Sequence, residues 1–436
     1  MIDLERAALP MAMSIVLTAC ATSREFTQMD REHVKLMLHE VSNDVRDHYY
    51  DLRFHGVDWD AAVVRAEKEI DESTSLNIAM THVAAVLASL DDSHTFFIPP
   101  ARPYRHDYGF RVQAIGNRCF ITHVRPKSDA EGKGLKPGHE LLAINNFQVG
   151  TANLDQVEYV LRELQPQAGL RLTLKDLTGE ELQLDVLAQT RPVIGSGRDG
   201  ARQRSDLIRE AEDANDLKRA EYGAIGEIEI LKLRGFNFDI EALGDVLDDA
   251  RQRRAMIIDL RGNLGGGEDQ LKALIGALFD KDVKLGDLVG RKERSPMVVE
   301  AARKPFSGKL VVLVDSLSAS SSEVLARVVK LEKRGTVMGD RSAGSVMRAM
   351  SYTHQVTMGI NSAVFYGASV TVADLIMIDG KTLEHAGVMP DVLMVPTAAD
   401  LVEESDPVLS HAVETLGGEL SPREAEKLFP YRWPRL

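Results

Sequence analysis

The spacing of apolar residues divides the chain into regions that predict different secondary structure. Within residues 31–90, apolar side chains recur every three or four positions, as at Val34 and Leu38, which predicts helices. The runs "DYGFRVQAI" and "RCFITHVRP" that follow are strand-like and belong to a small unit beginning at residue 104. From residue 221 strands alternate with helices, and the continuous apolar runs "AMIIDL" and "LVVLV" predict strands covered on both faces.

Composition and charge narrow the possible functions. The chain has 436 residues, enough for two or three domains with cores of their own. Its formal net charge is −14 and no Lys/Arg-rich run stands out, which argues against a nucleic-acid partner. The two cysteines, Cys20 and Cys119, cannot build a disulfide scaffold, and no His/Cys cluster has the spacing of a metal site. We therefore expect no metal and no cofactor.

The first residues resemble a bacterial lipoprotein signal. The apolar run "LPMAMSIVLTAC" ends at Cys20 and is too short to cross a bilayer as a helix, and the polar tether "ATSREFTQMD" follows it. The resemblance implies lipid attachment at Cys20, a membrane partner, and a periplasmic location in the bacterial cell envelope. Because Asp3 and Glu5 outweigh Arg6 where such a signal is positive, an ordinary apolar N-terminus is the alternative.

The small unit that begins at residue 104 resembles a PDZ domain. Residues 130–145 match the pattern Ala-x-x-x-Gly-Leu-x-x-Gly-x-x-Leu-x-x-Ile-Asn, and Tyr108, Gly109 and Phe110 stand where that family keeps its carboxylate-binding loop. The resemblance implies a groove that binds an extended peptide, with backbone N–H groups near Gly109 holding a C-terminal carboxylate. A β-rich spacer without a ligand is the alternative.

Two turns that follow predicted strands carry groups suited to acyl transfer. In "DLRGNLGGGEDQL" the glycines let the backbone approach a substrate, so the N–H of Gly265, or of Gly266, is a candidate oxyanion donor. In "VDSLSASSSEVLARV" Ser320 stands at a strand-to-helix turn, and the N–H of Ser321 lies at a helix N-terminus, where negative charge is favoured. A flexible turn, and a capping box of Ser320 with Glu323, are the alternatives.

A third stretch, "DGKTLEHAGVMPDVLM", completes a pattern that resembles a known peptidase family. The order of a helical segment, a PDZ-like unit, "DLRGNLGGG", "VDSLSASSSE", "GDRSAGS" and "LEHAGVMPDV" is similar to that of C-terminal processing (tail-specific) proteases and the tricorn core protease. The likeness covers residues 76–396. It implies a crotonase-like (ClpP/crotonase) α/β catalytic domain in which Ser320 is the nucleophile.

The chain departs from the serine–lysine branch of that family at the base. The lysine of that branch corresponds to Ser345 in "DRSAGSVM", and a serine cannot take the proton. The tricorn-like branch uses a histidine preceded by a serine, together with a downstream glutamate, and these correspond to His94, Ser93 and Glu384. The resemblance implies that His94 is the base and that Ser93 and Glu384 orient its imidazole. Without the resemblance, His94 reads as a polar residue at a helix end and Glu384 as the partner of an arginine.

These inferences combine into one predicted organisation. The expected parts are a lipoprotein signal and tether (1–26), a helical segment that contributes to the active site (27–103), a PDZ-like domain (104–188), a linker (189–220), a crotonase-like peptidase domain (221–400) and a helical tail (401–436). The predicted function is a serine endopeptidase that cleaves polypeptides through an acyl-enzyme, using a Ser-His-Ser-Glu tetrad. The alternatives are an inactive peptide-binding scaffold, a hydrolase of non-peptide esters, and a Ser–Lys mechanism that borrows Lys330 or Lys381.

Overall fold

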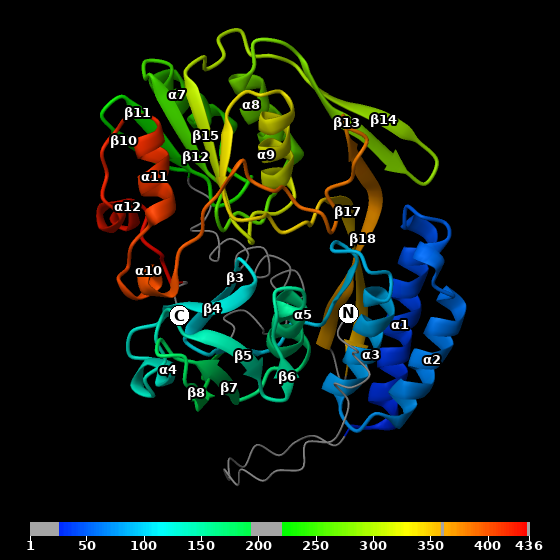
Figure 1. The fold of residues 1–436 in the computed structure, drawn as a ribbon. Coiled ribbons are helices and arrows are strands. Elements are labelled where there is room, and N and C mark those ends of the chain that lie inside the picture. The colour runs from blue at the N-terminus through cyan, green and yellow to red at the C-terminus, as the bar shows by residue number, and fades with distance from the viewer. Residues whose placement is uncertain (1–25, 193–219, 359–361, 434–436) are drawn as a thin grey trace.

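A six-stranded sheet forms the centre of the C-terminal half in the computed structural model, which describes residues 26–192, 220–358 and 362–433 (Figure 1). The strand order is β10 (Glu221–Ile225), β11 (Ile228–Lys232), β12 (Ala255–Asp259), β15 (Lys309–Val314), β16 (Thr336–Gly339) and β19 (Val392–Leu393). Strand β10 is antiparallel to β11, and all the other pairings are parallel. The carboxyl ends of β12 and β15 therefore meet at one edge of the sheet.

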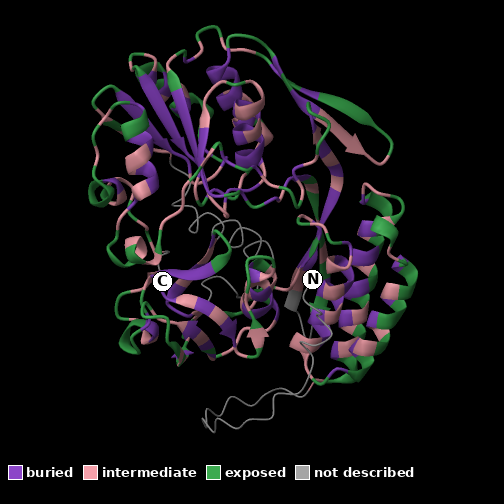
Figure 2. Ribbon diagram, in the orientation of Figure 1, coloured by how far each residue is buried: buried purple, intermediate pink, exposed green. Residues whose placement is uncertain are grey.

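Helices cover both faces of this sheet, as the continuous apolar runs predicted. One face packs against α7 (Ile240–Ala250), α8 (Glu268–Leu278) and α9 (Ser321–Leu331), and the other against α11 (Pro407–Thr415) and α12 (Pro422–Leu428). Alternation along each strand sends Ile258 into the first core and its neighbour Ile257 into the second. Figure 2 shows the inner strands β11, β12 and β15 as almost wholly buried.

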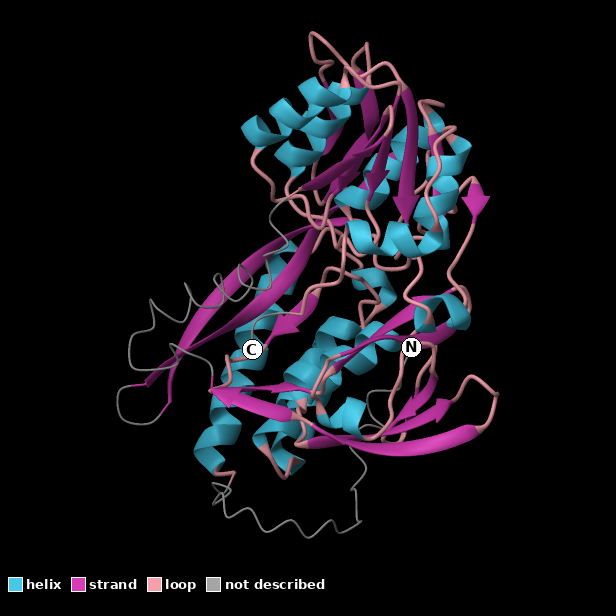
Figure 3. Cartoon of the chain, turned by 90° about the vertical axis from the view of Figure 1, so that its left-hand side faces the viewer, coloured by secondary structure: helices cyan, strands magenta, loops and turns pink. Residues whose placement is uncertain are grey.

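A second sheet is built on a long hairpin that the sequence analysis did not predict. Strands β17 (Met347–Met358) and β18 (Ser362–Met377) pair along most of their length, and Figure 3 shows them reaching far from the first sheet. The opposite edge of β18 pairs with β1 (Phe96–Ile98) and β13 (Val283–Gly290), and β14 (Arg294–Val299) follows β13. The hairpin thus carries the polypeptide from the peptidase domain to the N-terminal region.

The N-terminal helices pack against this hairpin, so they form no separate core. Helices α1 (Gln28–His48), α2 (Trp59–Glu72) and α3 (Leu76–Ala88) confirm the predicted helical region, with the 3₁₀ turn η2 (Phe54–Gly56) between the first two. Val34 and Leu38 of α1 share a buried cluster with Tyr366 and Val370 of β18. Burial of this shared apolar surface holds the helices on the hairpin.

The PDZ-like domain is a separate β-rich unit with its own core. Its strand order is β3 (Phe110–Ile115), β4 (Arg118–Val124), β5 (Glu140–Ile144), β7 (Gly169–Lys175) and β8 (Glu181–Leu187), with the short β6 (Phe147–Gln148) beside β5. The helices are α4 (Asp129–Gly132) and α5 (Leu154–Tyr159), the latter continuing as a π-helical turn over Val160–Leu164. The chain enters through β2 (Tyr104–Asp107) and leaves through β9 (Gln189–Pro192), and these two strands pair with each other.

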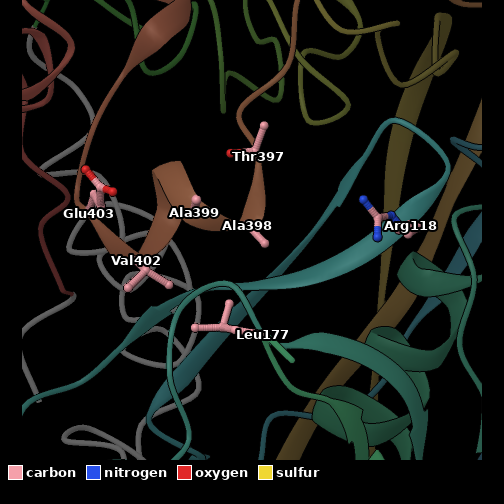
Figure 4. A pocket seen from close by; sticks show the side chains of 7 residues that line it. All are labelled: Arg118, Leu177, Thr397, Ala398, Ala399, Val402 and Glu403. Atoms are coloured by element: carbon pink, nitrogen blue, oxygen red, sulfur yellow. The ribbon is translucent and has the colours of Figure 1, made fainter. Parts of the chain in front are cut away.

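A crevice separates the PDZ-like domain from α10 (Ala398–Val402). Its lining residues are Arg118, Leu177, Thr397, Ala398, Ala399, Val402 and Glu403 (Figure 4). At Gly138 the two parts touch, since a Cβ there would lie 2.6 Å from the Ala398 carbonyl oxygen. None of the residues predicted to take part in catalysis lines this crevice.

The structure describes only one of the two cysteines. Cys20, the predicted lipid attachment site, lies outside the described residues. Cys119 of β4 is buried and free, and burial raises the pKa of its thiol to about 11. Among the described residues, no helix has the length and apolar character needed to cross a membrane.

A buried ion cluster attaches the C-terminal helices to the first sheet. The Arg261 guanidinium donates two hydrogen bonds to Asp259, at the end of β12, and two to Asp406, at the start of α11, all between 2.7 and 2.9 Å. Asp259 also pairs with Lys232 at 3.1 Å. Asp406 additionally caps α11 by accepting from the Leu409 N–H at 2.9 Å.

This cluster predicts the stability of two variants at Asp406. Asp406→Asn keeps the cap but removes the charge facing Arg261, so we expect a loss of about 1–3 kcal/mol in the free energy of unfolding. Asp406→Ala should lose about 1 kcal/mol more because the cap disappears. Urea unfolding followed by circular dichroism measures both.

Glu403→Gln is the matched control, since Glu403 pairs with Arg423 on the surface at 3.0 Å. We expect that change to stay within about 0.5 kcal/mol. Equal stability of Asp406→Asn and Glu403→Gln would contradict an anchoring role for the cluster.

Candidate active site

Ser320 lies where β15 turns into α9, in a backbone conformation that serine seldom adopts. Its φ is 54° and its ψ −117°, which costs roughly 1–3 kcal/mol and persists only where the surroundings enforce it. Such a sharp strand-to-helix turn lifts a side chain out of the sheet edge. The predicted nucleophile therefore occupies a backbone geometry suited to that role.

Asn263 joins the glycine-rich turn to the turn that carries Ser320. Its side chain is fully buried and donates to the Leu233 carbonyl oxygen at 2.9 Å. Its own carbonyl oxygen accepts from the Ala319 N–H at 2.9 Å and from the Ser322 hydroxyl at 3.0 Å. Sequence reasoning did not single out Asn263, although a polar residue two positions before the three glycines was the available signal.

The candidate oxyanion donors differ in their hydrogen bonds. The Gly265 N–H, our first choice from the sequence, donates to the Asn263 side-chain oxygen at 2.8 Å. The N–H groups of Gly266 and Ser321 have no acceptor among the described residues. Gly265 instead provides space: a Cβ at its φ of 96° would lie 2.6 Å from the Ser320 Cβ.

Glu323 is a buried carboxylate behind Ser320, the predicted nucleophile. It accepts from the Ser320 N–H at 3.2 Å, one side of the predicted capping box, and from the N–H groups of Gly344 and Ser345 at 2.8 Å each. The Ser342 hydroxyl adds a bond of 2.6 Å. Burial raises the pKa of Glu323, and the hydrogen bonds oppose that rise. The sequence predicted only the capping box of Ser320 with Glu323, and it did not predict the hydrogen bonds of Glu323 to the turn at residues 342–345.

One peptide group connects the nucleophile to Glu384. The Ser345 carbonyl oxygen accepts from the Ser320 N–H at 2.8 Å. The next N–H along the chain, that of Val346, donates to a Glu384 carboxylate oxygen at 2.9 Å. Ser345 therefore lies beside Ser320, at the position where the serine–lysine branch has its base, and it contacts the site through its backbone.

Ser93, His94 and Glu384 come together across 291 residues of sequence. The Ser93 N–H and hydroxyl donate to the two oxygens of Glu384 at 2.8 and 2.9 Å, and the Ser93 oxygen lies 2.8 Å from His94 Nδ1. Because a carboxylate only accepts, the Ser93 proton points to Glu384 and its oxygen accepts from Nδ1–H. This arrangement leaves the Nε2 lone pair of His94 free to accept a proton.

The environment of His94 favours the neutral imidazole. Burial lowers its pKa, and the carboxylates of Glu384 and Asp92 act in the opposite direction. A histidine that is neutral at physiological pH and oriented by a hydrogen-bonded carboxylate relay can act as a general base.

The structure does not join the serine and the histidine directly. Among the described residues, no hydrogen bond links the Ser320 hydroxyl to His94, and such contacts often tighten only when substrate binds. The two lysines considered as alternative bases, Lys330 and Lys381, lie in unfavourable positions to take the proton of Ser320. Lys330 lies ten residues along α9, about 15 Å by helix geometry, and binds Asp391 at 2.9 Å. Lys381 is exposed.

The predicted carboxylate-binding loop of the PDZ-like domain is occupied by its own side chains. The Gly109 N–H donates to Asp107 at 2.9 Å, and Asp107 pairs with Arg125. Tyr108 and Phe110 are both buried, and the Tyr108 hydroxyl donates to a backbone carbonyl oxygen. The structure therefore places Tyr108 and Gly109 directly before β3 and Phe110 at its first position, with the Gly109 donor already engaged.

Comparison with known proteins identifies the same three parts. Residues 227–394 match peptidase family S41, residues 30–75 the tricorn protease C1 domain and residues 100–175 the PDZ domain. The chain is 24% identical to tricorn protease homolog 2 of Streptomyces coelicolor over 409 residues, covering 86% of this chain and 31% of that relative. It is 26% identical to the chloroplastic carboxyl-terminal-processing peptidase 3 of Arabidopsis thaliana over 398 residues, covering 85% and 70%.

The fold also has solved counterparts. Mature CPAF superimposes with a TM-score of 0.63 at 14% identity, covering 86% of this chain and 94% of that one. At such identity the likeness concerns the fold alone. The S41 match includes both Ser320 and Glu384. Residues 227–394 thus form a peptidase family S41 domain, and regions that match the tricorn protease C1 domain and the PDZ domain precede it.

Proposed function

We propose that this chain is a serine endopeptidase that cleaves polypeptides through an acyl-enzyme, with His94 as the base for Ser320. The observation that carries the proposal is the relay from Glu384 through Ser93 to His94 Nδ1, which leaves Nε2 free. The same Glu384 carboxylate reaches the Ser320 turn through the Ser345–Val346 peptide group.

The proposed reaction uses each of these groups in turn. The Ser320 hydroxyl attacks the scissile carbonyl while His94 Nε2 takes its proton, and the resulting imidazolium is stabilised by the Ser93–Glu384 relay. Collapse of the tetrahedral intermediate breaks the C–N bond, and Nε2–H protonates the departing amine. Water then attacks the ester, with His94 again taking a proton, and releases the acid and the Ser320 hydroxyl.

The N–H groups of Ser321 and Gly266 are the proposed oxyanion donors. Both lack an acceptor among the described residues, and the Ser321 N–H stands at the first turn of α9. In this scheme Gly265 is needed for the space that it leaves beside Ser320 rather than for its N–H.

The proposed substrate is a polypeptide that reaches the PDZ-like domain with its C-terminus. Strand β3 is at the edge of its sheet, the position to which an extended peptide adds in this mode of recognition, and the Ser316 hydroxyl contacts this strand at the Ala114 carbonyl oxygen. A lipid anchor at Cys20 and a place in the bacterial cell envelope belong to the same proposal, on the sequence alone.

Two other functions remain to be distinguished by experiment. An inactive scaffold would keep the fold and bind peptides without turnover. A hydrolase of non-peptide esters would use the same serine, but it would cleave a small ester and leave a denatured protein intact.

Substitution of Ser320 tests the proposed nucleophile. Ser320→Ala should lower cleavage of fluorescein-labelled casein by at least about 10³-fold and abolish labelling by a fluorophosphonate, because the acyl-enzyme can no longer form. The melting temperature should hardly change. Ser295→Ala, at an exposed serine of β14, is the control and should behave as wild type. Turnover that survives in Ser320→Ala would exclude the mechanism.

The proposed base makes the cleavage rate depend on pH. The base must be neutral to act, so kcat/KM should rise with pH through the pKa of His94. Because burial lowers that pKa, the rise should be centred below the ordinary value of about 6.5. A pH profile of casein cleavage from pH 4.5 to 9 measures this.

Matched histidine variants test whether His94 is the group that titrates. His94→Ala should lose at least about 10³-fold in kcat, whereas His411→Ala, on the surface of α11, should keep the wild-type profile. A midpoint above pH 8, or an active His94→Ala variant, would instead point to an amine base.

A further inference from the structure

Asp92 forms the turn that presents Ser93 and His94. One of its carboxylate oxygens, Oδ1, accepts from the His94 N–H at 2.8 Å and from the Thr95 N–H at 3.0 Å. Two successive N–H groups bound to one aspartate oxygen hold the backbone in a defined turn. The direction in which the His94 side chain leaves the backbone therefore depends on this carboxylate.

The same oxygen attaches the turn to the long hairpin. The Thr371 hydroxyl of β18 donates to Asp92 Oδ1 at 2.7 Å. The Thr371 N–H in turn donates to the Thr95 hydroxyl at 3.0 Å, and its carbonyl oxygen accepts from the Tyr50 N–H at 3.1 Å. The turn is therefore attached to β18, and β18 is attached through Thr371 to Tyr50, which follows α1. The other strand of this hairpin, β17, begins just after Ser345.

Asp92 also contributes charge. It and Glu384 are the two carboxylates that favour the protonated form of His94 against the effect of burial. The groups around it are Asp374 of β18 and the phenols of Tyr49 and Tyr50, whose pKa values are raised by burial and by these carboxylates. The phenols are neutral at physiological pH, so Asp51, Asp92, Asp374 and Glu384 supply the negative charge in this region.

We propose that Asp92 is a positioning residue for His94: it fixes the direction of the imidazole through the turn and stabilises the imidazolium through its charge. The inference rests on the proposed function, since it assigns a role toward the base of that reaction. The relay through Ser93 and Glu384 acts on Nδ1, whereas Asp92 acts on the backbone and through space. The two supports are therefore separable by mutation.

Two substitutions separate the turn from the charge. Asn keeps an oxygen that accepts the same donors, so Asp92→Asn should preserve the turn while removing the charge. Asp92→Ala removes both. Asp91→Asn is the matched control, because it makes the same charge change one residue away, at an exposed position outside these hydrogen bonds.

Two measurements are made on each full-length variant. One is the rate of labelling by a fluorophosphonate across pH 4.5–9, which reports the reactivity of Ser320. The other is the titration of the His94 imidazole by NMR with ¹³C-labelled histidine, assigned by the signal lost in His94→Gln, which needs no catalysis.

For Asp92→Asn we expect the titration midpoint of His94 and the labelling midpoint to fall together, by roughly half a pH unit or more. The labelling rate on the plateau should stay within about threefold of wild type. Asp92→Ala should label at least about tenfold more slowly on the plateau, and Asp91→Asn should match wild type in both measurements.

Two results would contradict the proposed role of Asp92. Unmoved midpoints in Asp92→Asn would remove the role of the charge, and a folded Asp92→Ala that labels at the wild-type rate would remove the role of the turn. If wild type itself does not label, the proposed peptidase function fails, and the NMR titration still decides whether Asp92 acts on His94.

Discussion

The arrangement of the site depends on one buried carboxylate, that of Glu323. Taking a carboxylate out of water is costly unless donors surround it, and here three backbone N–H groups and a hydroxyl do so. These donors come from the nucleophile turn and from the turn at residues 342–345, so the charge can be satisfied only when both turns are in place. The unusual φ of Ser320 persists because this constraint holds its N–H.

The second turn then links the nucleophile to the relay. Held by Glu323, the Ser345–Val346 peptide group accepts from Ser320 on one side and donates to Glu384 on the other. Glu384 in turn binds both polar groups of Ser93. A lysine at position 345 would have supplied the base from this turn. With a serine there, the proposed base, His94, comes from the N-terminal helical region.

Local patterns and family resemblance predicted different parts of this structure. The helices of residues 27–103 and the buried strands β12 and β15 followed from periodicity, because burial on one face or on both leaves a direct mark on the sequence. The grouping of Ser93, His94 and Glu384 followed only from resemblance, because no periodic pattern records a contact across 291 residues. The bonds of Glu323 to the 342–345 turn were missed for the same reason.

The long hairpin was missed for a different reason. Strand β17 mixes polar with apolar residues and β18 contains continuous apolar runs, and much of their apolar surface is covered by helices from the far end of the sequence. A strand whose covering partner is distant is ambiguous in sequence. Likewise, the glycines marked the oxyanion turn, but the bond from Gly265 to Asn263 depends on side-chain geometry that composition does not record.

The PDZ-like domain is joined to the catalytic turns rather than only tethered beside them. Gln113 of β3 donates to Asp315 at 2.7 Å, and the Gly116 N–H donates to Asp340 at 2.6 Å. Asp315 precedes the turn of Ser320, and Asp340 precedes the turn of Ser345. A displacement of β3 would therefore act on both turns that Glu323 holds together.

The C-terminal segment reinforces this attachment from the other side. Tyr431 stacks on His123 of β4 with ring centroids 4.0 Å apart, and the Trp433 ring lies under the guanidinium groups of Arg111 and Arg125. Burial lowers the pKa of His123 to about 4, so the stack keeps a neutral imidazole. The domain is thus fixed to the peptidase body at two separated places.

In the proposed mechanism the base comes from outside the peptidase domain, so the reaction depends on packing between distant parts of the chain. The helices that precede His94 are held by apolar contacts with β18, and β18 is also the strand on which Asp92 fixes the His94 turn. Loosening of the helices from the hairpin would withdraw the base while Ser320, Glu323 and the oxyanion turn stayed in the peptidase domain. In that mechanism Ser320 would then be intact but unactivated, so the apolar surface between helices and hairpin would be a requirement of the chemistry as well as of the fold.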